Sequence, residues 1–400
     1  MKYLILGGGP AGLSLAHSLI DRGETSVLVL EKENSAGGLC RSVTVDSSPL
    51  DIGGGHFLDT RNSKVCDFLF RFMPESEWDT YVRDSRIRLG QNEISHPFEA
   101  NIWQLDIDSQ VRYLADISRA GCVTGTPKPE AFTEWIRWKL GDCIADDYML
   151  PYNSKMFGNN LNDLGTYWLN KLPDVSFEDT LRSCLEHRAY GTQPGHARFY
   201  YPRKFGYGEL WKRMGNELGD HIEYGKTIQT VDTDKHIVTT SDGSVYEADM
   251  IITTIPWASV REWVGMPDGL KDAISRLKHT AVVIEYHSED IDSEAHWIYI
   301  PDPKTSYHRI LVRKNFCPES RGYWTETNTD RYTSDPDGTT SFNNEYAYPL
   351  NTIDKPQIMK DLLDWSRSRK LIGLGRWGEH EHYNSDVVVE RAMKLAERML

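Results

Sequence analysis

Met1-Lys-Tyr-Leu-Ile-Leu-Gly7-Gly-Gly9-Pro10-Ala11-Gly12 opens the chain, an apolar run that breaks into a glycine-rich turn before a helical pattern. Dinucleotide sites have this order of strand, phosphate-binding turn and helix. The first glycine permits the tight turn, the second lets the backbone approach a pyrophosphate, and the third lets the helix pack closely on the strand. We therefore predict that the turn binds a dinucleotide at the helix N-terminus. The contact residues would be Gly7, Gly9, Pro10, Ala11 and Gly12.

A second apolar run, residues 26–30, ends in Glu31, nineteen residues after Gly12. An acidic residue at about this distance binds the ribose hydroxyls in such sites. The preceding strand, the following helix and the acid all agree, so a dinucleotide site is favoured over the alternative of an ordinary structural turn.

Gly37-Gly38-Leu39-Cys40-Arg41-Ser42 follows Glu31-Lys32 closely. This second glycine pair resembles the FAD-binding domain of amine oxidases, protoporphyrinogen oxidases and UDP-galactopyranose mutases. The resemblance implies that the cofactor is FAD and not NAD. It also implies further cofactor contacts from Lys32, Gly38 and Leu39, because in that class these glycines lie along the pyrophosphate and ribityl chain.

Composition excludes several classes of function. The formal charge of −14 and the pI near 5.4 argue against a nucleic-acid surface. No apolar run approaches the ~18 residues of a membrane helix, and the N-terminus enters the first strand directly, so we expect no signal peptide and a soluble, cytoplasmic protein. The six cysteines include no Cys-x-x-Cys pair, which favours reduced thiols over disulfides or a metal site.

We predict an α/β fold with a discontinuous Rossmann-like domain, because strand patterns recur far from the N-terminus and a helical pattern ends the chain. The two inserted segments differ in the spacing of their apolar residues. One has the spacing of helices, and the other alternates between apolar and polar residues as strands do. The predicted division is residues 1–60, 197–256 and 352–400 for the FAD-binding domain, 61–196 for a mainly helical insertion, and 257–351 for an antiparallel β-sheet substrate domain.

Asp51-Ile-Gly53-Gly54-Gly55-His56 places three glycines before a histidine. Such a segment brings backbone amides and an imidazole close to something flat and crowded, here the isoalloxazine ring of the flavin. We therefore predict that Gly54, Gly55 and His56 lie beside the flavin. The alternative is a glycine-rich loop with a solvated histidine.

The later segments of the chain resemble one family in particular. Arg309-Ile-Leu-Val-Arg-Lys-Asn-Phe316, Glu326, Tyr346-Ala-Tyr348-Pro-Leu-Asn-Thr352 and Gly375-Arg376 to Asn384 are similar in order and spacing to UDP-galactopyranose mutases, as is Pro151 to Gly158. The resemblance implies a catalytic set, two further flavin contacts and a substrate set. These are His56, Arg309, Tyr348 and Arg376 for catalysis, Arg376 and Asn384 beside the flavin, and Tyr152, Phe157, Arg309, Glu326, Tyr346, Tyr348 and His382 for the substrate.

In that family, N5 of reduced FAD attacks the anomeric carbon of a nucleotide sugar, the nucleotide departs, and the sugar recloses through a different hydroxyl without net redox. The resemblance implies the same interconversion of pyranose and furanose forms here, in cell-surface polysaccharide biosynthesis, with UDP-galactose or a relative and an external reductant such as NAD(P)H. Arginines hold a departing diphosphate in a bidentate fork, and Arg309 is the best candidate. Each tyrosine could equally serve packing.

The chain also departs from the family. His380-x-His382-x-Asn384 stands where the family has Tyr-x-Tyr-x-Asp, residues 174–177 lack the arginine of the family's mobile loop, and Phe157 replaces a tryptophan. Either the nucleotide sugar differs or the chemistry has moved. The alternatives are an FAD-dependent oxidoreductase of the amine oxidase or protoporphyrinogen oxidase type and a non-catalytic FAD-binding protein. The sequence leaves the sugar and the oligomeric state open, and a homo-oligomer is compatible with it.

Overall fold

A five-stranded parallel sheet forms one half of the computed structural model, which describes residues 1–169, 172–192, 197–333 and 340–399. Its order is β10-β2-β1-β14-β21, and every neighbouring pair is parallel. The strands are β1 (Tyr3–Leu6), β2 (Val27–Leu30), β10 (Ile222–Glu223), β14 (Met250–Thr253) and β21 (Leu371–Gly373). They come from the beginning, middle and end of the chain, which confirms the predicted α/β fold with a discontinuous Rossmann-like sheet.

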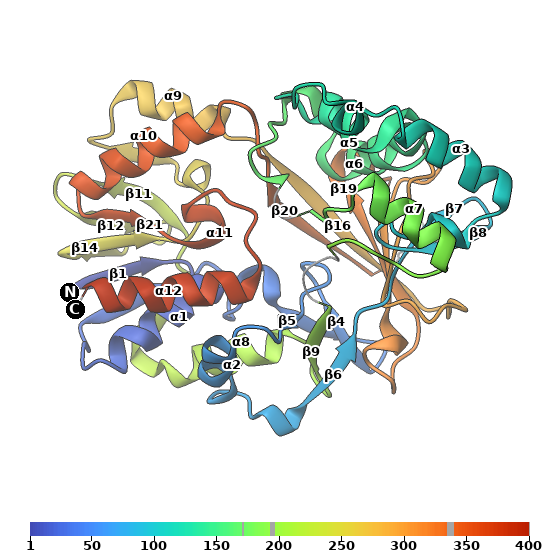
Figure 1. The fold of residues 1–400 in the computed structure, drawn as a ribbon. Coiled ribbons are helices and arrows are strands. Elements are labelled where there is room, and N and C mark those ends of the chain that lie inside the picture. The colour runs from blue at the N-terminus through green and yellow to red at the C-terminus, as the bar shows by residue number, and fades with distance from the viewer. Residues whose placement is uncertain (170–171, 193–196, 334–339, 400) are drawn as a thin grey trace.

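Helices cover both faces of this sheet, as parallel sheets require. In Figure 1, α1 (Pro10–Ile20) and α12 (Ser385–Met399) lie side by side on one face, and α10 (Lys355–Ser368) lies on the other. The tyrosine hydroxyl of Tyr3 donates a hydrogen bond to the carbonyl of Met399 at 3.4 Å, so the first strand and the last helix are joined. Helix α8 (Gly208–Glu217) packs next to α1, where His17 contacts the carbonyl of Met214 at 2.9 Å.

A four-stranded sheet and a short helix extend the face that carries α10 (Figure 1). The elements are β11 (Ile228–Asp232), β12 (Ile237–Thr240), β13 (Val245–Glu247), β15 (Glu262–Val264) and α9 (Asp268–Arg276). Apolar side chains of these elements bury themselves against Leu4, Leu6 and Ile251 of the parallel sheet. This apolar cluster joins the four-stranded sheet and α9 to the parallel sheet.

The second large sheet has the order β20-β16-β19-β18-β17-β7-β8. The strands are β7 (Ser85–Leu89), β8 (Asn92–Ser95), β16 (His279–His287), β17 (Trp297–Tyr299), β18 (Arg309–Val312), β19 (Tyr323–Asn328) and β20 (Ser341–Pro349). The antiparallel prediction is confirmed for every pair except β17 and β7, which are parallel.

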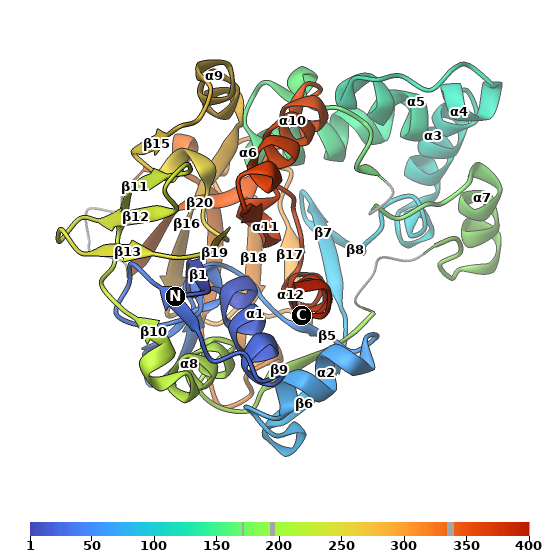
Figure 2. The same ribbon diagram turned by 90° about the vertical axis from the view of Figure 1, so that its left-hand side faces the viewer.

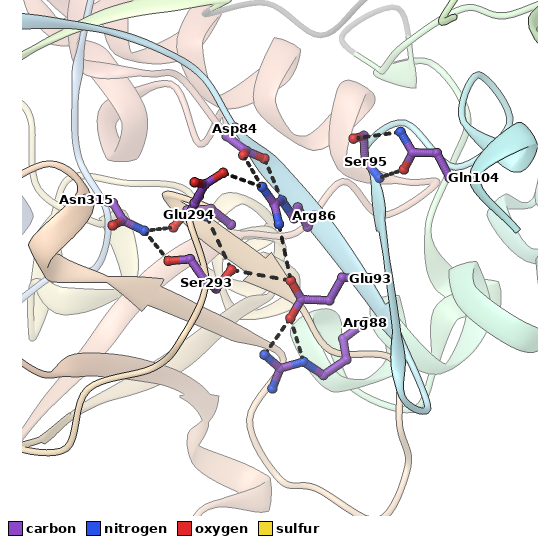
Figure 3. A network of polar contacts seen from close by, with 10 residues as sticks. Asp84, Arg86, Arg88, Glu93, Ser95, Gln104, Ser293, Glu294 and Asn315 are labelled. Carbon is purple, nitrogen blue, oxygen red and sulfur yellow. Dashed lines mark hydrogen bonds and ion pairs between the residues drawn. The ribbon is translucent and has the colours of Figure 1, made fainter. Parts of the chain in front are cut away.

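The hairpin of β7 and β8 comes from the segment predicted to be mainly helical. Its polar face forms the network drawn in Figure 3: Arg86 bonds Asp84 at 2.7 Å, and Arg88 bonds Glu93 at 2.6 Å. The hairpin also reaches Ser293, because its hydroxyl lies 3.3 Å from Glu93. This network joins the helical insertion to the large sheet.

The remaining helices gather mostly above the large sheet, as Figures 1 and 2 show. Apart from β7 and β8, the main elements between residues 61 and 196 are α2 (Ser63–Phe70), β6 (Trp78–Val82), α3 (Ile107–Ile117), α4 (Gly121–Thr124), α5 (Phe132–Ile144), α6 (Leu150–Phe157) and α7 (Phe177–Glu186). Two small sheets connect the halves, β3 (Ser42–Val45) with β4 (Ser48–Asp51), and β5 (Leu58–Asp59) with β9 (Arg198–Pro202) and β6. The exact domain boundaries stay a prediction.

Within the described ranges, no helix is both long and apolar enough to cross a membrane. The same residues contain no group of three or more His, Cys, Asp or Glu side chains placed to hold a metal ion.

Candidate active site

The glycine turn after β1 leaves its backbone uncovered toward a second glycine loop. Gly7 has φ +106°, and a Cβ there would meet the hydroxyl of Thr254 at 2.5 Å. Gly9 is the N-cap of α1, and a Cβ on Gly38 would lie 3.3 Å from the Cα of Gly9. The loops are joined where the amide of Gly37 donates to the carbonyl of Gly8 at 2.8 Å. Two backbone segments and a helix N-terminus therefore meet without side chains between them, as a pyrophosphate site requires.

Glu31 stands at the carboxyl end of β2, beside the same turn. Its buried carboxylate accepts hydrogen bonds from the amides of Gly8 at 2.7 Å and Glu33 at 2.9 Å. Burial raises the pKa of Glu31, although the two amides favour its charged form. Lys32 is exposed and pairs loosely with Glu33 at 3.8 Å. The cradle and the fixed acid fit the dinucleotide part of FAD.

A cavity of about 180 Å³ is lined by strands of the second large sheet, by the triple-glycine loop at residues 53–55 and by the segment 376–385. Its walls hold four residues that were predicted to act in catalysis and three of the other predicted contacts. The catalytic candidates are His56, Arg309, Tyr348 and Arg376. The others are Gly55, His382 and Asn384. Residues separated by more than 300 positions thus meet in one place, and their assigned roles stay predictions.

His56 reaches the cavity from the triple-glycine loop. Gly54 has φ +98° and therefore favours glycine, and a Cβ on Gly55 would meet the end of the Leu311 side chain at 2.3 Å, so the loop packs tightly there. The Nδ1 atom of His56 lies 3.0 Å from the carbonyl of Gly54. Because a carbonyl can only accept, Nδ1 carries the proton and Nε2 is left as an acceptor. Burial lowers the pKa of His56 to about 4, so the imidazole is neutral at physiological pH.

Arg309 and Glu326 form a buried ion pair in the cavity wall. Their strands, β18 and β19, place them directly opposite each other, and Nε of Arg309 donates to Oε2 of Glu326 at 2.9 Å. The amide of Gly55 donates to Oε1 of the same carboxylate at 3.1 Å. Burial alone would raise the pKa of Glu326, but the Arg309 charge outweighs it and holds the pKa at about 2. Burial likewise opposes the charge of Arg309, while Glu326 keeps its pKa well above the ordinary value.

Arg309 therefore lines the cavity, whereas Glu326 lies behind it, outside the cavity lining. Its side chain has no exposed surface, because the glycine loop covers one oxygen and the guanidinium the other. In this structure the carboxylate orients Arg309 and neutralises its charge, and the predicted substrate contact by Glu326 stays a prediction. Tyr348 completes this group, since its hydroxyl lies 3.2 Å from Nη2 of Arg309.

Arg376 enters the cavity from α11 (Gly375–Gly378). It donates to the carbonyl of Ala347 at 3.1 Å and twice to the carbonyl of Tyr383, at 3.0 and 2.8 Å. Burial lowers the pKa of Arg376. The partners are neutral carbonyls, so the guanidinium can stabilise an electron-rich group placed beside it.

Besides Glu326, three predicted substrate residues lie outside the cavity lining. Tyr152 is buried on α6 near Tyr299, with ring centroids 5.3 Å apart, and Phe157 packs on Trp168 at 6.2 Å. Tyr346 stacks on His279 at 4.5 Å. Their contact with a substrate stays a prediction.

The cavity also contains residues that sequence reasoning missed, above all Arg83, Phe57, Phe199 and Trp297. The alternation of β17 offered one signal, since it puts Trp297 on the same face as Tyr299, opposite Arg309. Arg83 stands in a polar connection with no motif around it.

Comparison with known proteins identifies the family of the chain. The sequence model of the family described as flavin containing amine oxidoreductase matches residues 10–289. A UDP-galactopyranose mutase from Mycoplasma pneumoniae is 33% identical over 121 residues, which are 30% of this chain and only 27% of that protein. An uncharacterized protein in the nifH2 3' region of Methanothermococcus thermolithotrophicus is 36% identical over 94 residues, 22% of this chain and 89% of its own length.

Solved structures share the whole fold. A crystal structure of reduced UDP-galactopyranose mutase superposes with a TM-score of 0.91 at 22% identity, covering 100% of this chain and 95% of that one. A fatty acid isomerase from P. acnes that produces CLA gives a TM-score of 0.67 at 14% identity, covering 100% and 98%. At these identities the likeness establishes the fold.

Proposed function

We propose that this chain, which belongs to the family of flavin containing amine oxidoreductases, is a flavin-dependent sugar-nucleotide mutase. It would interconvert the pyranose and furanose forms of a nucleotide sugar, UDP-galactose or a relative. The observation that carries the proposal is the buried pair of Arg309 and Glu326 in the wall of the cavity. A departing diphosphate needs an oriented guanidinium, whereas loss of hydride from an amine does not.

The glycine turn, Gly38 and Glu31 would hold the dinucleotide part of FAD, and His56 and Arg376 would flank its ring system. When bound in its reduced form, FAD supplies a nucleophilic ring nitrogen and electron-rich character without being consumed. Arg376 would stabilise that electron-rich character, because its bonds to carbonyls leave its charge unopposed by a carboxylate within the described residues.

Arg309 would hold the diphosphate as it departs. Its hydrogen bonds within the described part of the chain use Nε and Nη2, which leaves the two protons of Nη1 for an anion. Glu326 fixes the guanidinium before the substrate arrives, so no reorganisation is needed as charge develops. The nucleotide is then kept close for recapture.

His56 and Tyr348 supply neutral polar groups near this charge. The unprotonated Nε2 of His56 can accept a proton from a sugar hydroxyl. The Tyr348 hydroxyl, which donates to Glu326 at 3.4 Å in this structure, would turn to donate to a leaving oxygen. Phe57, Phe199 and Trp297 form an apolar wall that excludes water, which would otherwise trap the activated sugar. An external reductant such as NAD(P)H, a cytoplasmic setting and a role in polysaccharide biosynthesis belong to the same proposal.

The decisive experiment uses the purified FAD-loaded protein, reduced anaerobically with dithionite. We expect catalytic reductant to support many turnovers between UDP-galactopyranose and UDP-galactofuranose, followed by chromatography of the nucleotide sugars, and we expect no activity when the protein is oxidised. Stoichiometric peroxide formation with an amine or a porphyrinogen, without sugar interconversion, would favour an oxidoreductase.

A further inference from the structure

His308 is a buried histidine directly before β18, behind the ion pair of Arg309 and Glu326. Its side chain has no exposed surface, and neither of its ring nitrogens has a hydrogen-bond partner within the described ranges. Buried polar groups are normally satisfied, because an unmet donor or acceptor costs the free energy of its lost hydration. An imidazole retained in the core without such partners is a candidate for a role in the reaction.

The imidazole faces the carboxylate of Glu326. Nε2 of His308 lies 3.5 Å from Oε2 of Glu326, a distance that is long for a hydrogen bond but short for an ion pair. Oε2 is also the oxygen that accepts from Nε of Arg309, at 2.9 Å. Arg309 lines the cavity, whereas Glu326 and His308 do not. The three side chains therefore run in order from the cavity wall into the core.

The ionisable groups that act on this imidazole come from β18, β19 and α6. Burial lowers the pKa of His308, and the positive charges of Arg309 and Lys155 lower it further. The negative charge of Glu326 opposes them and raises it. Tyr152 of α6 packs edge-on against the imidazole, with ring centroids 6.1 Å apart, and burial keeps its phenol neutral by raising its pKa. While Arg309 neutralises Glu326, the imidazole is therefore neutral at physiological pH.

A diphosphate in the cavity would change this balance. Its negative charge would compete with Glu326 for the positive charge of Arg309. The hydroxyl of Tyr348, which donates to Oε2 of Glu326 at 3.4 Å, would also turn away toward the leaving oxygen. Glu326 would then be a buried carboxylate with less compensation, which is costly. A proton on His308 would restore the compensation, because opposite charges this close attract strongly away from water.

Resting on the proposed mutase function, we propose that His308 is a positioning residue that takes up one proton from solvent when the diphosphate binds to Arg309. The step adds a proton to a ring nitrogen and breaks no bond of the substrate. Both ring nitrogens then carry protons, and Nε2 donates toward Oε2 of Glu326. The imidazolium holds Glu326, and through it Arg309, while the bond between sugar and nucleotide breaks. The proton returns to solvent when the nucleotide leaves.

Calorimetry of UDP-galactose binding to the oxidised, FAD-loaded protein tests this step, because a proton taken up on binding adds the ionisation heat of the buffer. The phosphates of UDP-galactose do not titrate near neutral pH, so any such proton goes to the protein. In PIPES and Tris buffers at pH 7 we expect uptake of up to one proton for each UDP-galactose bound. Since the protonated site binds better, the affinity should rise as the pH falls from 8 to 6, by at most about tenfold per pH unit for one proton.

His308→Gln should still bind UDP-galactose but should take up no proton, and its affinity should be independent of pH over this range. His296→Gln is the matched control, because His296 is also buried but its Nδ1 accepts from the amide of Asp84 at 3.0 Å. It should take up as many protons as the wild type. His56→Gln should do the same, since the proposal places the proton on His308 and not on the imidazole in the cavity wall.

Binding of UDP-galactose by the wild type without proton uptake would overturn the role of His308 and leave the mutase proposal intact. Uptake that persists in His308→Gln, or that is lost in His56→Gln, would assign the proton to another group and also overturn it. The wild type and His56→Gln decide the question even where His308→Gln does not fold. Failure of the wild type to bind UDP-galactose would reject both proposals together.

Discussion

Replacement of Glu326 by glutamine tests the central pair of the site. Glutamine has the same shape and can still accept from Arg309 or from the Gly55 amide, but it removes the charge that neutralises the guanidinium. Arg309 would then be a buried cation without its partner, with Arg376 in the same cavity. Removing one partner of a buried ion pair is strongly destabilising for this reason.

The magnitude follows from the pKa of Glu326, which is about 2 in the folded chain against an ordinary value of 4.5. Each pKa unit corresponds to about 1.4 kcal/mol, so the folded environment favours the charged form by about 3 kcal/mol. Because the folded pKa is the lower one, this stabilisation is complete above pH 4.5 and is lost as the pH falls through about 2. We expect Glu326→Gln to lower the free energy of unfolding by about 3 kcal/mol at pH 7.

Urea denaturation of the wild type and the variant at pH 7 and at pH 3.5 measures this effect. The difference between them should narrow at the lower pH, since only the wild type loses the carboxylate contribution. Glu93→Gln is the control, because Glu93 also pairs with arginines but lies in the partly exposed network of Figure 3. Its cost should stay below about 1 kcal/mol.

A Glu326→Gln variant as stable as Glu93→Gln, with no dependence on pH, would refute the reasoning. It would mean that water or structural relaxation screens the pair, and that Glu326 does not hold Arg309 in position.

Three further predictions concern the cradle and the cavity. Gly9→Val should keep the fold, because its Cβ meets only the Cα of Gly38 at 3.9 Å, but it should lose FAD in absorbance measurements. Gly12→Ala should instead unfold the chain, because its Cβ would sit 2.0 Å from a carbonyl oxygen. A Gly9→Val protein that keeps all of its FAD would contradict this prediction. The pH profile of kcat should show no step near 6.5 from His56, since burial lowers its pKa to about 4, and a step that vanishes in His56→Ala would count against a neutral imidazole. Arg309→Lys keeps a positive charge beside Glu326, and its kcat/KM should fall by a factor that corresponds to about 2–4 kcal/mol of lost transition-state stabilisation. Unchanged kinetics would show that Arg309 does not bind the diphosphate.

The nucleotide-binding fold could be predicted because its signals are local. Strand, turn and helix follow one another within the first 20 residues, and the apolar runs of the parallel strands are short and continuous. The burial of Glu326 could not be predicted in this way. Its cover is the amide of Gly55, 271 positions earlier in the chain, and no local pattern reports a contact over that distance.

The strand that follows Arg83 shows why the cavity side was harder to predict than the cofactor side. Residues 85–89 alternate as Ser-Arg-Ile-Arg-Leu, a strand pattern too short to stand out beside the helical patterns around it. Once β7 joins β17, Arg83 lies over Trp297 and across from Arg309. A chain with a formal charge of −14 thus directs three arginines, Arg83, Arg309 and Arg376, into one cavity. Such a local concentration of arginines would draw anionic ligands into the cavity despite the net negative charge of the chain.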